Sequence, residues 1–133
     1  MVIQQHIIDI IKHKAAKEWP ADYEMQKYTI ENQIEAYNSI ELYKKKFDKN
    51  NIVINIINNA TAEYIDDYEM QLYYINNQLE AILELNEYHN SDIPNDVLEN
   101  IKNTALNEWP DDYEMQLFTI KKQVEAWLEL NKL

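Results

Sequence analysis

The sequence predicts an all-α protein made of three tandem helical hairpins, six helices in all, stacked as a short α-solenoid or packed as a compact bundle. Asp-Tyr-Glu-Met-Gln occurs at 22–26, 67–71 and 112–116, so the repeat period is 45 residues. Apolar residues four positions apart flank it, which is the spacing of one helical face. Glycine is absent, and two of the three prolines stand just before the repeated string. We expect a single domain, residues 1–133, with repeat units 1–45, 46–90 and 91–133.

The first helix of each unit is predicted from apolar residues spaced by four: Ile7, Ile11 and Ala15; Ile52, Ile56 and Ala60; Val97, Ile101 and Ala105. A turn follows at each Trp-Pro, because proline disfavours a helical conformation at the residue before it. We expect the aromatic residue at each turn to plug the open end of its hairpin: Trp19, Tyr64 and Trp109.

The second helix of each unit is expected to begin with a capping box, Asp66…Glu69 and Asp111…Glu114. The first copy has Ala21 at this place, so its cap is expected to be weaker or to move to Asp22. The predicted buried seams are Tyr23, Ile30, Ile34 and Tyr37; Tyr68, Leu72, Ile75, Leu79 and Ile82; Tyr113, Leu117, Ile120, Val124 and Trp127.

Two breaks separate the units. Residues 91–94, Ser-Asp-Ile-Pro, form a clear one, and residues 44–51 a charged one. With no glycine in the chain, Asn50, Asn86 and Asn90 are the expected left-handed helix stops.

Glutamines recur inside the predicted apolar arc of each second helix: Gln26 and Gln33, Gln71 and Gln78, Gln116 and Gln123. One interpretation is that these amides form hydrogen bonds to a ligand. The other is that they form hydrogen bonds across helices to the backbone or to tyrosine hydroxyls, since a buried unpaired amide is costly. We favour the structural interpretation.

The composition excludes several functions. The chain lacks Gly, Cys and Arg, and its net charge is −12. It therefore has no phosphate-cradling loop, no nucleophile elbow and no thiolate zinc site. The acidic surface opposes direct binding to nucleic acid or anionic lipid. We expect a cytoplasmic protein without a membrane span.

Catalytic and metal sites are not expected either. None of the three histidines has Glu three residues before it, as a helical-bundle metal site requires. His6 and His13 lie on one face, which suits a weak chelate less well than a structural role. The two serines, Ser39 and Ser91, have no visible catalytic partners. The sequence predicts no enzyme, no cofactor and no metal.

The candidate partner-binding residues are an aromatic position that falls among acidic residues on each second helix, and the uncovered end of the last helix. Two alternatives stand for the aromatic residues: they anchor a protein partner, or they pack on a neighbouring hairpin or on their own first helix. The set comprises Tyr28, Tyr73, Phe118, Glu69, Glu80, Glu114, Glu125 and Trp127. Trp127 belongs to the last unit, which no further repeat follows, so this end is a candidate dimer surface.

The acidity is concentrated in the later repeats. Residues 1–45 carry six Lys and seven acidic residues, residues 46–90 two and eight, and residues 91–133 four and nine, for net charges of −1, −6 and −5. Such a surface either serves only solubility or docks on a basic partner.

The turn Trp-Pro-x-Asp-Tyr-x-Met-Gln, with the later Gln-x-Glu-Ala, resembles the helical oligomerisation extension that follows some bacterial PH-like domains. The resemblance covers residues 16–40, 61–85 and 106–130. It implies a noncatalytic role in self-association or partner binding. The chain departs from that setting because no PH-like β-domain is present and three copies stand alone.

Two functions are consistent with these observations. The first is a noncatalytic helical-repeat protein that acts through contact with a protein partner or through self-association, as a homo-oligomer. The second is an acidic inhibitor, of an antidefence or immunity type, that occupies the basic nucleic-acid-binding surface of a target protein.

Overall fold

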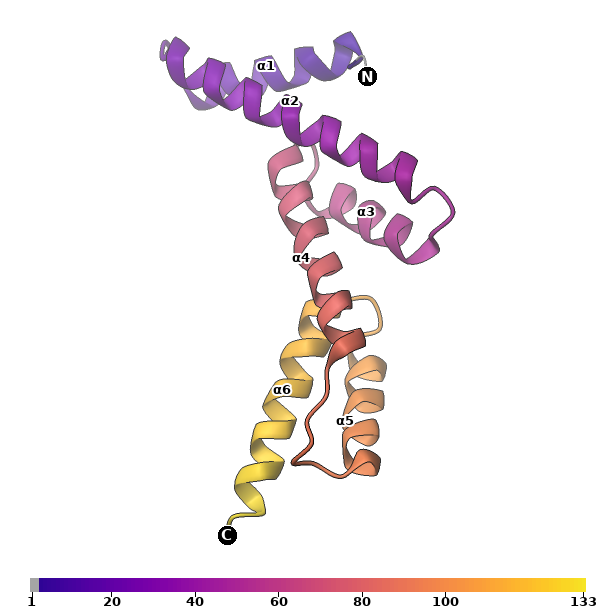
Figure 1. Cartoon of the computed structure of the whole chain (residues 1–133). Coiled ribbons are helices and arrows are strands. Elements are labelled where there is room, and N and C mark those ends of the chain that lie inside the picture. Colours follow the sequence, from indigo (N-terminus) through magenta and orange to yellow (C-terminus); the bar gives the residue numbers. More distant parts are fainter. Residues whose placement is uncertain (1–2) are drawn as a thin grey trace. The chain divides into compact units, whose positions relative to one another are not determined.

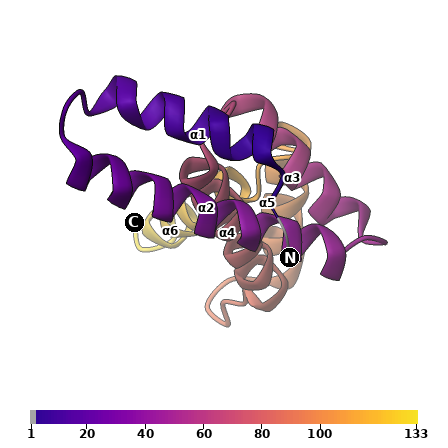
Figure 2. The same ribbon diagram turned by 90° about the horizontal axis from the view of Figure 1, so that it is seen from above.

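The computed structural model describes residues 3–133 and contains six helices (Figure 1): α1 (Gln5–Glu18), α2 (Tyr23–Lys46), α3 (Asn51–Glu63), α4 (Tyr68–Glu87), α5 (Asn95–Glu108) and α6 (Tyr113–Leu130). No strand occurs within this part of the chain. The all-α class, with six helices arranged as hairpins, is confirmed. Each hairpin closes through a short turn, and Figure 2 shows α1 and α2 running side by side on either side of theirs.

The chain divides into two compact units, and the boundary falls between Ile75 and Asn76, within α4. Each unit is described by itself below. The single domain that the sequence predicts stays a prediction, as does the form of the stack.

The core of the first unit comes from all its helices. It is formed by Ile11 and Ala15 of α1, Ala36 and Ile40 of α2, Val53, Ile56, Ile57 and Ala60 of α3, and Tyr68 and Ile75 of α4. Ile52, which the four-residue spacing places on one helical face with Ile56 and Ala60, is nevertheless exposed. Ile52 lies in the first turn of α3, and that helix turns Val53, Ile56 and Ile57 inward instead.

The core of the second unit is formed by α5, α6 and the segment before them. Ile93, Leu98, Ala105, Ile120 and Val124 are buried together, and Leu85, Tyr88, Val97, Ile101, Trp127 and Leu128 pack against them. Ile93 comes from the predicted break, which is indeed non-helical between α4 and α5. This connection therefore contributes to the core.

Aspartate caps the second helix of every hairpin. The Asp22, Asp67 and Asp112 carboxylates accept hydrogen bonds from the backbone N–H of Met25, Met70 and Met115 at 3.1, 3.2 and 3.1 Å. The expected shift to Asp22 is confirmed. The capping box predicted at Asp66 and Asp111 is wrong by one residue: the cap is the second aspartate of each pair.

The left-handed positions lie in these turns. Within residues 3–133, the positive φ angles are 60° at Ala21 and 58° at Asp66. The prediction of left-handed stops at Asn50, Asn86 and Asn90 is therefore wrong. Asn50 has a φ of −98° and caps the start of α3, where its side chain accepts from the N–H of Ile52 and Val53.

Candidate protein-binding surfaces

Each hairpin turn is held by a glutamine from its second helix. Three Nε2 groups, from Gln26, Gln71 and Gln116, donate to the carbonyls of Trp19, Tyr64 and Trp109, over 2.8, 2.8 and 2.7 Å. The structural interpretation of these three amides is confirmed. The aromatic residues themselves end the first helices and are half-buried.

The next glutamine connects one hairpin to the following one. In the first unit, Gln33 of α2 reaches the beginning of α4, where its Nε2 donates to Asp67 Oδ1 at 3.1 Å. Its Oε1 accepts from the backbone N–H of Tyr68 at 2.7 Å. We call this arrangement of a glutamine with an Asp-Tyr helix start the joint.

The second unit contains the same joint. Gln78 of α4 donates to Asp112 Oδ1 at 3.1 Å and accepts from the N–H of Tyr113 at 2.7 Å. The Gln78 side chain is fully buried. Because N–H groups at a helix start have no partner within the helix, each joint satisfies one of them and fixes the capping aspartate at once.

Packing surrounds the joint. In the first unit, the Tyr37 and Tyr68 rings meet edge to face with 5.1 Å between centroids, and Lys14 Nζ donates to the Asp66 carbonyl at 3.2 Å. In the second unit, Lys121 forms an ion pair with Glu84 at 3.0 Å. Burial, followed by the charge of Asp66, raises the pKa of Tyr68, and burial and Asp111 likewise raise the pKa of Tyr113.

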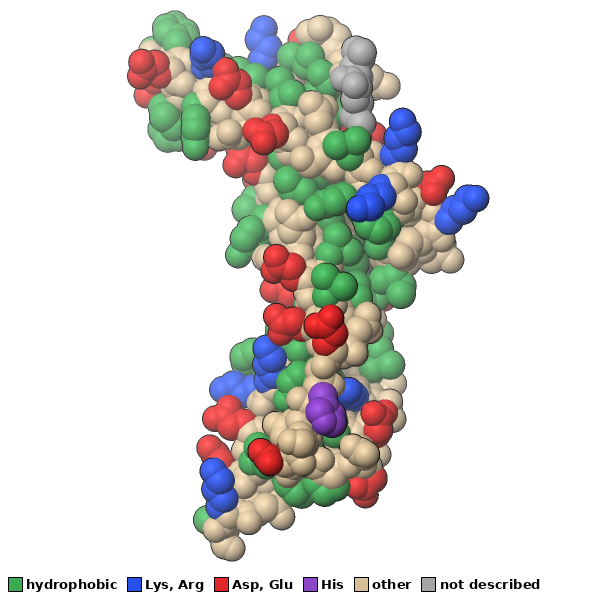
Figure 3. Space-filling view, viewed as in Figure 1, with side chains coloured by type: hydrophobic (Ala, Val, Ile, Leu, Met, Phe, Trp, Pro, Cys, Tyr) green, Lys and Arg blue, Asp and Glu red, His purple; other side chains and the backbone are tan. Residues whose placement is uncertain are grey.

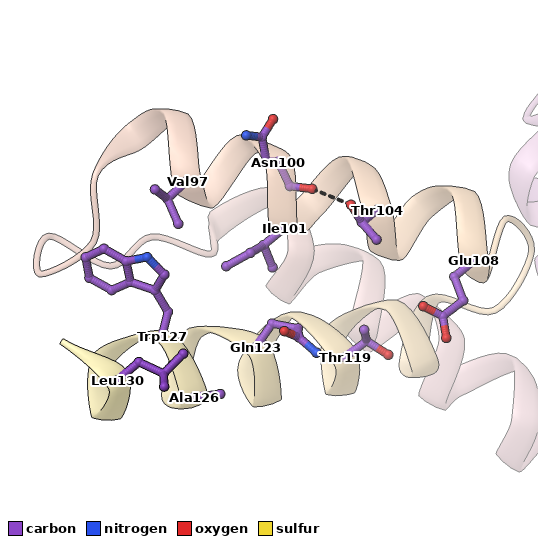
Figure 4. A pocket seen from close by; sticks show the side chains of 10 residues that line it. All are labelled: Val97, Asn100, Ile101, Thr104, Glu108, Thr119, Gln123, Ala126, Trp127 and Leu130. Atoms are coloured by element: carbon purple, nitrogen blue, oxygen red, sulfur yellow. Dashed lines mark hydrogen bonds between the residues drawn. The ribbon is translucent and has the colours of Figure 1, made fainter. Parts of the chain in front are cut away.

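The last glutamine has no joint to make. The Gln123 side chain is exposed and forms no hydrogen bond to any residue in 3–133. It lines a groove of about 400 Å³ between α5 and α6, with Val97, Asn100, Ile101, Thr104, Glu108, Thr119, Ala126, Trp127 and Leu130 (Figure 4). The sequence predicts that Trp127 lies on an uncovered surface of the last helix. Its side chain lines this groove and is half-buried.

The predicted aromatic residues lie outside the core. Tyr28, Tyr73 and Phe118 are 62%, 64% and 56% exposed. Each is therefore more than half exposed, although Phe118 also lines a groove with Glu80, Ala81 and Glu84 of α4. Lys122 Nζ lies 5.7 Å from the centroid of the Phe118 ring, so this position carries a cation that the other two lack.

Acidic side chains accompany these aromatic residues. Glu69, Glu80, Glu114 and Glu125 are all exposed, and Figure 3 shows acidic side chains interspersed with hydrophobic ones on the surface. Partial burial raises the pKa of Glu69, with further contributions from Asp67 and Glu18. Burial, Asp112 and Glu80 raise the pKa of Glu114. Negative charge is therefore crowded around the starts of α4 and α6.

The described residues hold no group of three His, Asp or Glu side chains that could bind a metal ion. None of the helices in that part of the chain has the length and apolar character needed to cross a membrane.

Sequence reasoning missed one surface residue. Tyr23 was predicted as part of a buried seam, but it is 75% exposed, whereas the corresponding Tyr68 is 9% exposed. The reason is that Tyr23 begins the second helix of the first hairpin, and no earlier glutamine lies against it. The signal was present in the spacing: each Asp-Tyr pair follows a glutamine by 34 residues, except the first.

Comparison with protein-family models, with curated proteins and with solved structures finds no match to this chain.

Proposed function

We propose that this chain is a noncatalytic helical-repeat protein that acts by binding another protein. The observation that carries the proposal is the exposed aromatic side chain at one position of three helices, Tyr28, Tyr73 and Phe118. Single exposed apolar residues are ordinary, but this one recurs with the repeat and stays more than half exposed each time. Aromatic side chains, tyrosine above all, are enriched among the residues that dominate protein interfaces.

The surroundings favour a partner with a basic surface. On α2, the exposed residues Glu24, Glu31 and Glu35 lie one or two turns from Tyr28. Glu69 and Glu80 lie similarly around Tyr73, and Glu114 and Glu125 around Phe118. An aromatic anchor within an acidic surround combines buried contact area with attraction to Lys or Arg.

Affinity capture tests this proposal. The chain is used as bait in an extract of its native host, beside a variant in which Tyr28, Tyr73 and Phe118 are all changed to Ser. The control changes three equally exposed residues away from these positions, Leu42, Ile65 and Leu83. We expect a partner that the bait and the control capture and that the aromatic variant loses. Equal capture by all three would contradict the proposal.

A second candidate function, the acidic inhibitor, is favoured by the crowded negative charge. Residues 46–133 carry almost all of the net charge, and Glu80 and Glu114 lie close enough for one to raise the pKa of the other. This function predicts a nucleic-acid-binding partner whose complex dissociates between about 0.1 and 0.5 M salt, since screening shortens the range of exposed charges. Competition with a DNA duplex distinguishes it: displacement of the chain supports the inhibitor, and a complex indifferent to DNA contradicts it.

A further inference from the structure

The two ends of the repeat array have complementary surfaces. The last hairpin keeps Gln123, the residue type that forms both internal joints, and no helix start within residues 3–133 lies beside it. The first hairpin keeps Asp22 and Tyr23, the pair that both joints hold, and has no glutamine against it. We propose that molecules of this chain associate head to tail, with Gln123 of one copy forming a third joint to Asp22 and Tyr23 of the next.

The groove volumes show that the end site matches an occupied internal one. In the first unit, the groove lined by Ile11, Lys14, Glu18, Thr29 and Gln33 measures only about 60 Å³, because Asp66 and Asp67 of the next hairpin enter it. The corresponding positions on α5 and α6, Ile101, Thr104, Glu108, Thr119 and Gln123, line the groove of about 400 Å³. Ala15 also lines the groove of the first unit. Its counterpart on α5 is Ala105, which is buried. The end groove is therefore an internal groove without its neighbour.

Apolar surface is left uncovered at the same end. Ile40 of α2 is 3% exposed, whereas Leu130, its counterpart on α6, is 66% exposed. Ala36 and Ala81 are buried, and their counterpart Ala126 is exposed. Burial of such surface is the main driving force of association, and here the covering element is one that the chain already contains.

The Asp22 carboxylate can accept one more hydrogen bond, as the proposed joint requires. Asp67 Oδ1 accepts from both Met70 N–H and Gln33 Nε2, whereas among the described residues Asp22 Oδ1 accepts from Met25 N–H alone. Tyr23 and Trp127 occupy the positions of Tyr68 and Tyr37, whose rings meet edge to face. The third joint therefore pairs Tyr23 with Trp127, an aromatic contact of the same kind.

The end joint differs in charge from the internal joints. The first hairpin has Ala21 where the internal joints have Asp66 and Asp111, so one acidic residue is missing from the end joint. Lys27 takes the place of Leu117, which lies beside Glu84 and Lys121, and Glu129 takes the place of Glu84. Lys27 of one copy can thus pair with Glu129 of the next, whereas Glu31, which takes the place of Lys121, brings a like charge toward Glu129. The end joint should therefore depend on salt more than the internal ones.

The two surfaces differ, so the association is heterologous and forms open chains or closed rings rather than a symmetric dimer. This inference deepens the proposed role in protein contact, but it uses the end surfaces and not the aromatic positions. Each proposal can therefore fail without the other.

The test blocks one end at a time in the full chain. Tyr23→Ala removes the ring from the head, and Ala126→Arg fills the groove at the tail. Both side chains are exposed in the single chain, so circular dichroism should show unchanged helix content. Tyr28→Ala serves as the control, because Tyr28 is another exposed tyrosine on the same helix.

Sedimentation velocity gives the readout, up to a protein concentration of about 1 mM, which is the effective concentration that a short linker provides within one chain. We expect the mean mass of the unmodified chain and of the Tyr28→Ala control to rise with concentration. Each blocked variant alone stays monomeric, and an equimolar mixture of the two forms a 1:1 dimer that does not grow.

Three results would overturn the inference: a monomer at every concentration, blocked variants that associate like the unmodified chain, or a mixture that fails to pair. Loss of partner capture in Tyr28→Ala with intact self-association would leave this inference standing and assign the aromatic positions to another protein.

Discussion

Glutamine suits the joint because its amide is a donor and an acceptor at once. The acceptor meets a backbone N–H at a helix start, and the donor meets the carboxylate that caps the same helix. A glutamate would place a second carboxylate against Asp112. An alanine would leave the Tyr113 N–H without its acceptor and remove one of the two donors to Asp112. The identity of this residue is therefore set by two partners that lie 34 and 35 positions away in the chain.

Removal of the second-unit joint should cost substantial stability. Gln78→Ala leaves the Tyr113 N–H without its acceptor in a buried site, which costs about 1–3 kcal/mol. Gln123→Ala is the matched control, because the same residue type at the corresponding position is exposed and unbonded. Urea unfolding in dilute solution should show a lower midpoint for Gln78→Ala and an unchanged midpoint for Gln123→Ala. Equal effects of the two substitutions would show that the joint does not contribute to stability.

Substitution of Ala21, which has a left-handed backbone conformation, should stabilise the chain. Its φ of 60° is unfavourable for a residue with a Cβ, and asparagine tolerates this region better. Ala21→Asn should therefore stabilise the chain by about 0.5–1 kcal/mol. Ala16→Asn, at an exposed position of α1, should instead destabilise it by about 0.5 kcal/mol through lower helix propensity. Thermal unfolding followed by circular dichroism measures both changes; a lower melting temperature for Ala21→Asn would refute this explanation of the turn.

At the level of helices, the sequence predicted the elements and misplaced some of their ends. The four-residue spacing identified Ile11, Ala15, Ile56, Ala60 and Ala105 as core residues correctly. The cap was misplaced because Asp66 and Asp67 stand side by side and either residue type suits a helix start. The turn decides between them: Asp66 takes a left-handed conformation, which leaves Asp67 to cap α4. This choice depends on the backbone conformation of the turn, which the spacing of apolar residues does not predict.

The start of α6 should make stability depend on pH. The pKa of Glu114 is raised, so the folded state holds this proton more firmly than the unfolded state, whose Glu pKa is about 4.3. As the pH rises from the unfolded pKa through the folded one, Glu114 ionises at the expense of the folded state, and its contribution to stability falls.

Glu114→Gln removes this effect. The variant should melt at a higher temperature than the unmodified chain at pH 7, and the gain should vanish below about pH 4, where both states of the unmodified chain are protonated. Melting temperatures measured from pH 3 to 7 test this. A difference between the two proteins that stays constant across the range would contradict the assignment.

At the level of the molecule, three similar hairpins differ in the joints that they form within residues 3–133. The middle hairpin takes part in two joints, and the outer hairpins in one each. Terminal repeats of repeat proteins usually carry a polar outer face. Lys27 fits this rule, since Leu72 and Leu117 occupy the same position later in the chain. The apolar surface of Ala126, Trp127 and Leu130 does not fit it, and that exception is the basis for head-to-tail association.

The fold class followed from the sequence because a repeat of 45 residues states the same helix pattern three times. The inward position of five of the six glutamines also followed from it, whereas Gln123 is exposed. Their partners did not, because helical periodicity assigns a residue to a face and does not say which neighbour that face meets. For the same reason Tyr23 was placed in the core: its pattern is that of Tyr68, and only the missing neighbour distinguishes the two.

Residue-resolved amide hydrogen exchange, followed by NMR at Tyr23, Tyr68 and Tyr113, tests the central claim most directly. The Tyr68 and Tyr113 N–H groups are bonded to glutamine and should exchange slowly at every protein concentration. The Tyr23 N–H should exchange fast in dilute solution and become protected as the concentration approaches about 1 mM. Protection of Tyr23 that does not change with concentration, or fast exchange at Tyr68 and Tyr113, would contradict the account.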